Sequence, residues 1–293
     1  MNIMQVFLNG LISSSIYLLI ALSFWQIYFV TNFFHFAHGA IIAFGAYAVF
    51  LLMVWMKLPL VLSIPVVVAM SVILGCGIEQ VIYRPLRKWD ANPIVYILAS
   101  LGLYTVLQNV ISLVFGDDAI SIRNGPVREG LLFFGARITS IQIITIVSSI
   151  VVFTSLLVFM KYARMGKEMR AVASNERLSL ISGIDSDRVI LWAFAIGSSL
   201  AALAGILVAL DTDMTPTMGM RPFMMGVVVV VIGGMRNVVG ILLASLLLGL
   251  MQNFAGVFCG SQWQDAIAFI VLLLFLLLRP QGFFGKKTRK AEV

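Results

Sequence analysis

The chain has only two histidines, His35 and His38, and their spacing would place them on one face of a helix. Two imidazoles could begin a metal site, but a closed zinc site needs four ligands, and no Cys, Asp or Glu lies near them in the sequence. We therefore predict no metal centre and no cofactor. We expect His38 to hydrogen-bond to a neighbouring helix, because a buried imidazole without a partner would be costly.

Glu79 lies near the end of a long apolar run and could in principle relay protons within a membrane. The basic residues that follow it favour another interpretation, in which Glu79 snorkels to the interface or pairs there with Arg84 or Arg87. The chain has no P-loop, nucleophile elbow, HExxH motif or Rossmann glycine fingerprint. We predict no catalytic residue, and if ATP drives this protein, a partner must hydrolyse it.

Two polar interruptions break otherwise apolar stretches, one from Asn32 to Gly39 and one from Gly233 to Asn237. A broken helix at membrane depth is tolerated only where its backbone is buried in protein or lines a watery cavity, so such breaks mark transport paths. Both could instead be turns at the membrane surface. The predicted path residues are the polar and glycine positions Ser13, Ser14, Asn32, His38, Gly39, Gln108, Asn109, Gly233, Gly234 and Asn237.

The elements that must position these residues are membrane helices. The 293 residues are 61% hydrophobic and only 11% charged, whereas soluble domains carry about 25% charged residues. The net charge of +7 does not indicate nucleic-acid binding, because the basic residues flank apolar runs and form no stripe with aromatic residues. They are typical of topology signals beside a lipid bilayer.

A helix that spans the hydrocarbon core needs about 20 mostly apolar residues. The chain offers nine candidate segments, which are 6–30, 34–56, 60–82, 94–115, 140–160, 189–210, 222–236, 239–257 and 265–278. The segments at 34–56 and 222–236 are the weakest, so eight spans would also fit. We predict an all-α, polytopic integral membrane protein in which residues 1–293 form a single transmembrane domain.

Fourteen of the twenty Lys and Arg residues lie at 84–88, 161–188 and 279–290. Because Lys and Arg near membrane spans stay in the cytoplasm, nine spans place all three segments inside and the N-terminus outside. The middle segment, a loop at about 161–188, is long enough to dock a partner, although it could also be a solvated linker. Its predicted contact residues are Gly166, Arg170, Ala171, Ala173, Glu176 and Gly183. The tail at 279–293 is the third cytoplasmic segment.

Several short motifs, taken together and in order, carry a family resemblance. They are Phe36 to Ala40, Tyr83 to Arg87, Ala99 to Gly102, Arg170 to Ile184, Gly233-Gly234 and Leu278 to Gly282. Along nearly its whole length the chain resembles the permease family of ATP-binding-cassette (ABC) importers for branched-chain amino acids, in particular the LivH-type subunits. Ala40 stands where many family members have Glu.

The resemblance implies an ABC importer permease bundle in a bacterial inner membrane. It implies as partners a LivM-type permease, two cytoplasmic ATPases of LivG and LivF type, and a periplasmic binding protein. The solute would cross by alternating access. Family members also carry urea, short amides and other small solutes, so the substrate class stays open.

Two other classes of membrane protein compete with this interpretation. An ion-coupled secondary transporter would need more intramembrane ion ligands than Glu79. A membrane-embedded enzyme would need catalytic groups that converge at one depth, and the paired histidines without carboxylates do not supply them.

Overall fold

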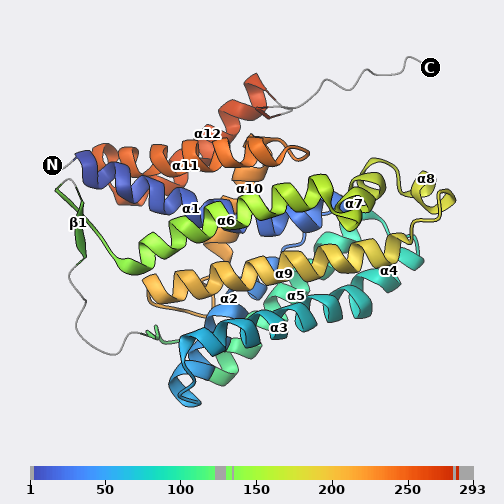
Figure 1. Cartoon of the computed structure of the whole chain (residues 1–293), viewed down its shortest axis with the longest axis horizontal. Helices are drawn as coiled ribbons and strands as arrows, with labels where there is room; N and C mark the ends of the chain where they lie inside the picture. The colour runs from blue at the N-terminus through green and yellow to red at the C-terminus, as the bar shows by residue number, and fades with distance from the viewer. Residues whose placement is uncertain (1–2, 123–129, 134, 280–281, 284–293) are drawn as a thin grey trace.

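The computed structural model describes residues 3–122, 130–133, 135–279 and 282–283, in which most of the chain forms long helices arranged as an elongated bundle (Figure 1). Within these residues, eight helical stretches are long and apolar enough to cross a membrane. They are α1 (Ile3–Thr31), α2 with its π-helical end η1 (His38–Phe50, Leu51–Trp55), α3 continued by η2 and α4 (Leu60–Ile78, Glu79–Tyr83, Arg84–Lys88), α5 (Pro93–Phe115), α6 (Ser140–Tyr162), α9 (Ser186–Asp211), α11 (Val238–Cys259), and η3 with α12 (Ser261–Trp263, Gln264–Leu278).

Three shorter helices complete the described bundle. They are α7 (Arg164–Ser174), α8 (Glu176–Ile181) and α10 (Met220–Gly233). A small antiparallel hairpin, β1 (Leu131–Phe133) and β2 (Ala136–Ile138), lies in the loop between α5 and α6. The predicted all-α membrane architecture is confirmed, and the hairpin is a minor addition to it.

Helix α1 forms the centre of the bundle because its sequence carries no charge and is apolar on nearly every face. It packs against α6, α9, α10 and α11. Large side chains such as Trp25 and Phe24 are buried there, with Phe194 of α9 and Phe223 of α10. Helices α3, α5 and α12 instead expose large apolar side chains, as expected for surfaces that meet lipid.

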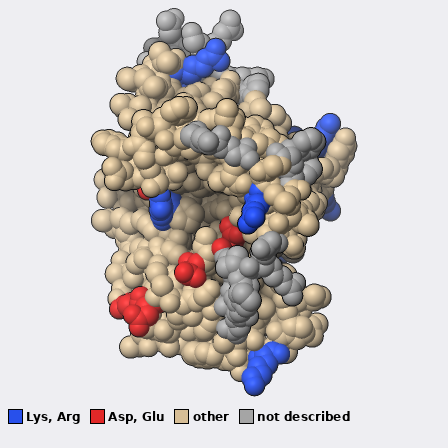
Figure 2. All heavy atoms as spheres, turned by 90° about the vertical axis from the view of Figure 1, so that its left-hand side faces the viewer, with Lys and Arg blue, Asp and Glu red and all other residues tan. Residues whose placement is uncertain are grey.

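The two ends of the bundle gather different segments, as the predicted topology requires. At one end, which we call the hairpin end, Gln5 of α1 exchanges hydrogen bonds with the Arg137 backbone, and Ile120 pairs with Met214. At the other, the α7 end, Arg84 pairs with Asp187 and the Trp25 indole donates to the Met235 carbonyl. Figure 2 looks onto the hairpin end and shows a mostly uncharged surface with scattered acidic and basic groups.

The two segments that looked weakest in the sequence are the two irregular ones in the structure. The predicted segment 34–56 becomes a helix only from His38, after a non-helical stretch. The predicted segment 222–236 becomes α10, whose 14 residues rise about 21 Å and cannot cross a core of about 30 Å alone. A non-helical stretch, Thr212 to Gly219, leads from the hairpin end into α10.

Candidate functional site

The first helical turns of α2 and α10 touch through two glycines. A Cβ atom on Gly39 would lie 3.4 Å from the Gly219 carbonyl oxygen, which is ordinary contact. A Cβ atom on Gly219 would instead overlap the Gly39 carbonyl oxygen and lie 3.1 Å from the Ala43 nitrogen. Both helices therefore begin inside the bundle, at a point where only backbone separates them.

Buried polar groups tie the break before α2 to three other elements. The Ser23 hydroxyl donates to the Ile20 carbonyl, so His38 Nε2 carries its hydrogen and donates to Ser23 Oγ at 2.8 Å. The Tyr83 hydroxyl lies 2.8 Å from His35 Nδ1, and the Ala37 N–H donates to Ser100 Oγ. Bonding of His38 to a neighbouring helix is confirmed.

Within the described residues, no group of three or more metal-ligating side chains surrounds the histidines or any other point. The polar groups around His35 and His38 instead bond to hydroxyls and to backbone. Each imidazole uses one ring nitrogen in this way, and its other nitrogen, His35 Nε2 or His38 Nδ1, is buried without a hydrogen-bond partner.

The other predicted path residues fall into separate places. Ser13 accepts a hydrogen bond from Asn253 at 3.0 Å, and Ser14 lies 3.4 Å from the Leu246 carbonyl oxygen, so both serve the α1–α11 packing. Asn32 ends α1 with φ of 55° and is exposed. These residues do not adjoin the Gly39–Gly219 contact.

Gly233, Gly234 and Asn237 form the tight turn between α10 and α11. Gly234 has φ of 95°, and the Asn237 side chain caps α11 by accepting from the Val239 N–H at 3.0 Å. A Cβ on Gly233 would lie 2.7 Å from the Gly240 carbonyl oxygen. At 1.5 Å per residue, this turn is about 20 Å from Gly219, so Gly233 and Gly234 lie far from the Gly39 end of the other predicted interruption.

Helix α5 carries a polar stripe on an exposed face. Gly102, Thr105 and Asn109 are exposed and Ser112 is half-buried, and the spacing puts all four on one side of the helix. Thr105, Asn109 and Ser112 line a shallow hollow of about 580 Å³. Gln108 is half-buried beside them. Val106, Val110 and Leu113 line the same hollow, and the Asn109 amide donates to the Thr105 carbonyl at 2.7 Å. The Asn109 amide oxygen remains unfavourable against lipid, which makes this face a candidate for contact with water or another protein.

The predicted docking loop folds into α7 and α8. Met169, Val172 and Ala173 are buried as α7 packs on α1 and α9, and Gly166 packs on the last turn of α6. On α7, Arg170 is exposed and Ala171 is half-buried; Glu176 on α8 is exposed. Of the predicted contact residues, Gly166 and Ala173 therefore face the chain's own bundle.

Helix α8 presents apolar side chains outward at the α7 end. Asn175 caps it by accepting from the Leu178 N–H at 3.0 Å, and Gly183, with φ of 80°, ends the segment. Leu178 is 60% exposed and Ile181 is 83% exposed. Exposed apolar side chains outside the membrane spans indicate a surface that another protein covers.

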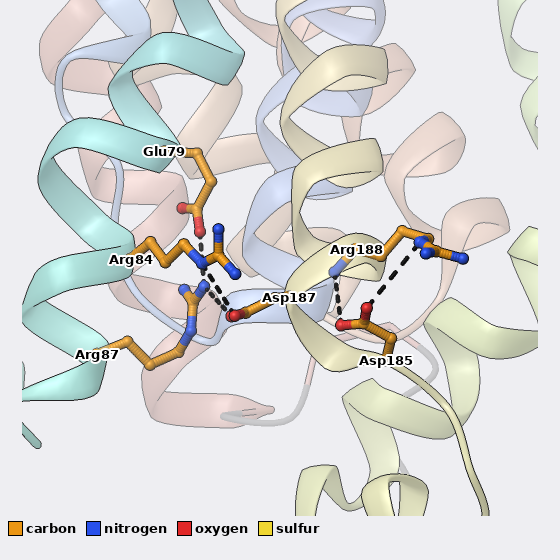
Figure 3. A network of polar contacts seen from close by, with 6 residues as sticks. All are labelled: Glu79, Arg84, Arg87, Asp185, Asp187 and Arg188. Carbon is orange, nitrogen blue, oxygen red and sulfur yellow. Dashed lines mark hydrogen bonds and ion pairs between the residues drawn. The ribbon is translucent and has the colours of Figure 1, made fainter.

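An ionic network joins η2 and α4 to the start of α9, directly after this loop (Figure 3). Arg87 donates to Glu79 Oε1 at 2.7 Å and to Asp187 Oδ1 at 2.8 Å, and Arg84 donates to Asp187 Oδ2 at 3.0 Å. The predicted pairing of Glu79 is confirmed, but at a more buried position than expected, because Glu79 is only 1% exposed. Asp185 caps α9 by accepting from the Arg188 N–H.

Nearly the whole chain matches one known protein family. Residues 6–276 match the family model described as "Branched-chain amino acid transport system / permease component". The chain belongs to this family. It is therefore a multi-pass membrane protein related to transport permeases, as its apolar helices indicate.

Individual relatives also match the chain over most of its length. The chain is 28% identical to the high-affinity branched-chain amino acid permease LivH of Escherichia coli K12, over 97% of this chain and 96% of the relative. It is 30% identical to BraD of Pseudomonas aeruginosa with the same coverage. A ribose import permease, RbsC of Haemophilus influenzae, is 27% identical over 80% of this chain and 72% of the relative. No solved structure matches the chain significantly.

Two features of the site were missed in the sequence, although both left a signal there. Pro216 and Gly219 stand between two apolar runs and mark the end of a helix and the start of another inside the bundle. Thr105, Asn109 and Ser112 recur at helical spacing and reveal the stripe, of which only Asn109 was predicted.

Proposed function

We propose that this chain is the transmembrane subunit of an ABC importer for branched-chain amino acids, in a bacterial inner membrane. The family match over residues 6–276 carries the proposal, and relatives named for this substrate class support it. The chain has no motif for binding ATP, so hydrolysis belongs to partner ATPases of LivG and LivF type. A LivM-type permease and a periplasmic binding protein complete the assembly.

The solute path runs along the exposed polar face of α5, between this subunit and the LivM-type permease. Thr105, Asn109 and Ser112 supply hydroxyl and amide groups along a face that would otherwise meet lipid. A partner permease that covers this face would enclose a path lined by polar groups on one side. The Gly39–Gly219 contact positions α2 and α10 against each other, and α2 in turn packs on α5. Glycines there let the two helices shift against each other during alternating access.

Coupling to the ATPases passes through the outward surface of α8, formed by Leu178, Leu180 and Ile181 with Arg177 and Glu176. A short connecting segment and two ion pairs link this surface to the membrane helices. Helix α9 begins three residues after Gly183, and Asp187 in its first turn is held by Arg84 and Arg87 of α4, which continues α3 through η2. Movement of α8 therefore reaches α9 and α3 together.

The test is uptake of radiolabelled leucine by cells that lack their own branched-chain amino acid transport and express this chain with its partner subunits. Asn109→Leu should lower the initial rate at least about tenfold, because a polar contact in the path is lost. Thr154→Leu is the matched control, since Thr154 is an exposed polar residue of α6 that donates to its own helix at 2.8 Å.

Two further arms separate the competing transport classes. Replacing the Walker lysine of the partner ATPases should abolish uptake, whereas dissipating the ion gradients at constant ATP should not; the opposite pattern indicates an ion-coupled transporter. Competition with unlabelled valine, isoleucine, ribose, urea and acetamide identifies the solute class. Wild-type uptake by Asn109→Leu would remove α5 from the path without touching the family assignment.

A further inference from the structure

An apolar groove lies between α6 and α9, close to the α7 end. It encloses about 480 Å³ and is lined by Val152, Leu156 and Phe159 of α6, Met165 of α7, and Trp192 and Ile196 of α9. Its polar lining is slight, with Ser155 as the one hydroxyl-bearing residue among those that line it. The groove opens to the membrane side of the bundle, where Trp192 is 50% exposed. Its size suits a large part of a single acyl chain.

Two arginines are close in sequence to residues that line the groove at the α7 end, although neither lines the groove itself. Arg188 lies one helical turn before Trp192 on the same side of α9, and Arg164 directly precedes Met165. Their side chains are 71% and 94% exposed. Each pairs with one nearby carboxylate, Asp185 at 4.0 Å and Glu168 at 3.0 Å, which leaves most of the five N–H donors of each guanidinium to other partners.

Aromatic residues mark the same level. Tyr162, at the last turn of α6, is 64% exposed, and Trp192 of α9 lines the groove. Tyr and Trp are enriched where a membrane protein crosses the headgroup region. Along the membrane normal, the apolar groove, the aromatic residues and the two arginines therefore follow in the same order as the acyl chain, interface and headgroup of a lipid.

We propose that this groove binds one anionic phospholipid of the cytoplasmic leaflet. The acyl chain lies between α6 and α9, and the phosphate is held by Arg164 and Arg188, whose forked donors match phosphate oxygens. Basic pockets between transmembrane helices on the cytoplasmic side hold anionic headgroups for this reason. A lipid is favoured over a protein partner on this face, because the exposed residues of α6 nearby are mostly apolar, as Val151 and Val158 are. The exposed polar residues there, Thr154 and Ser155, are small hydroxyls, and Thr154 donates to its own helix at 2.8 Å.

The bound lipid would stabilise the junction between α6 and α7. Ala163 joins α6 to α7, and its N–H bonds the Phe159 carbonyl at 3.0 Å, so the groove wall and this junction share residues. Gly166 packs on the same last turn of α6. A lipid seated against Phe159 and Met165 therefore stabilises the angle at which α7 leaves the membrane.

Native mass spectrometry of the full chain, purified in detergent and incubated with dioleoyl phosphatidylglycerol or dioleoyl phosphatidylcholine, tests the proposal. The wild-type chain should retain one phosphatidylglycerol and much less phosphatidylcholine. Arg164→Gln and Arg188→Gln should each weaken phosphatidylglycerol retention about fivefold, as expected when one basic residue near an anionic headgroup is lost. Arg137→Gln, at the hairpin end, is the matched control and should retain the lipid as the wild type does.

A second pair of variants tests the groove itself. Ser155→Trp should fill the groove and reduce lipid retention, whereas Ile150→Trp, on another side of α6, should not. Equal retention of both lipids by the wild type, or unchanged phosphatidylglycerol retention by the Arg164→Gln/Arg188→Gln double variant, would overturn the proposal. Crosslinking of a cysteine at Trp192 to another protein chain in membranes would also overturn it, in favour of a protein occupant.

Discussion

At the scale of single residues, the missing side chain at Gly219 and the buried charge at Glu79 are the most constrained features. Gly219 lets α10 start against the backbone of α2, and Glu79 is held in the apolar bundle by one arginine. The sequence singled out Glu79 as a carboxylate in an apolar run, but it offered no reason to choose Gly219. Each is constrained by a neighbour distant in the sequence or in the next turns of its own helix.

The Gly39–Gly219 contact predicts an asymmetry between two identical substitutions. Gly219→Ala places a methyl group on the Gly39 carbonyl and should destabilise the chain by about 1–3 kcal/mol, the usual cost of overpacking. Gly39→Ala meets its nearest neighbour at 3.4 Å and should cost clearly less. Unfolding of the purified chain in mixed micelles, followed by tryptophan fluorescence, gives both values. Equal losses would contradict this contact.

The Glu79–Arg87 pair predicts a cost that depends on which partner is removed. Arg87→Leu leaves Glu79 buried without its counter-ion and should cost about 3–5 kcal/mol. The double variant Glu79→Leu/Arg87→Leu should recover most of that loss, because no charge is then left unpaired. Arg84→Leu is the control: its pair with Asp187 is much more exposed, so we expect a loss of no more than about 1 kcal/mol in the same assay. A double variant as unstable as Arg87→Leu would rule out this account.

At the scale of elements, the loop that the sequence analysis treated as one unit consists of two helices, α7 and α8, with different roles. Helix α7 turns Met169, Val172 and Ala173 toward the membrane helices, and α8 turns Leu178 and Ile181 outward. The first anchors the segment to the chain, and the second is left for a partner.

This division predicts opposite phenotypes for two charged substitutions. Ile181→Asp should leave the stability of the chain within about 0.5 kcal/mol of wild type, as is usual for an exposed position, while tagged ATPase subunits no longer co-purify with it. Ala173→Asp buries an unpaired carboxylate and should destabilise the chain itself. Pull-down and unfolding measured on the same preparations distinguish the two. Normal ATPase recovery with Ile181→Asp would assign the docking surface elsewhere.

The elements also show what the sequence could predict. Nine apolar segments, their alternation and the weakness of 34–56 and 222–236 follow from hydropathy, because length and apolarity are local properties. Hydropathy does not predict which of the interrupted segments contact each other. Gly39 contacts Gly219 and not Gly233, and this contact depends on packing between segments that are distant in the sequence. The outward face of α5 could be read only in part, because periodicity shows that Thr105 and Asn109 share a face but not that the face is exposed.

At the scale of the whole molecule, the structure sorts its connecting segments between two ends, and the charge pattern predicts which end is cytoplasmic. The start of α1, the β1–β2 hairpin and the segment before α10 share one end, while α4, α7 and the α10–α11 turn share the other. The basic residues beyond 283 lie outside the described residues, so the tail remains a prediction.

The two natural cysteines make this orientation testable with few changes. Cys259 is exposed at the end of α11, on the hairpin side, while Cys76 lies within α3. A membrane-impermeant maleimide should label Cys259 in spheroplasts, and Cys259→Ser should abolish the signal. Ser182→Cys, placed after α8 in the Cys259→Ser background, should react only after the membrane is opened. Labelling of Ser182→Cys in sealed spheroplasts would invert the proposed orientation.

The order in which the network of Glu79 is completed bears on how the chain is made. Arg87 follows Glu79 by only eight residues on the same continuous helix, whereas Asp187 comes 100 residues after Arg87. At about 5–20 residues per second, the ribosome delivers Asp187 some 5–20 s after Arg87. The counter-ion of Glu79 is therefore synthesised within roughly half a second to two seconds of it, and the Glu79–Arg87 pair carries no net charge when the helix inserts. Asp187 can bind Arg87 only after α9 has been synthesised and inserted, so this second ion pair forms late in the assembly of the chain.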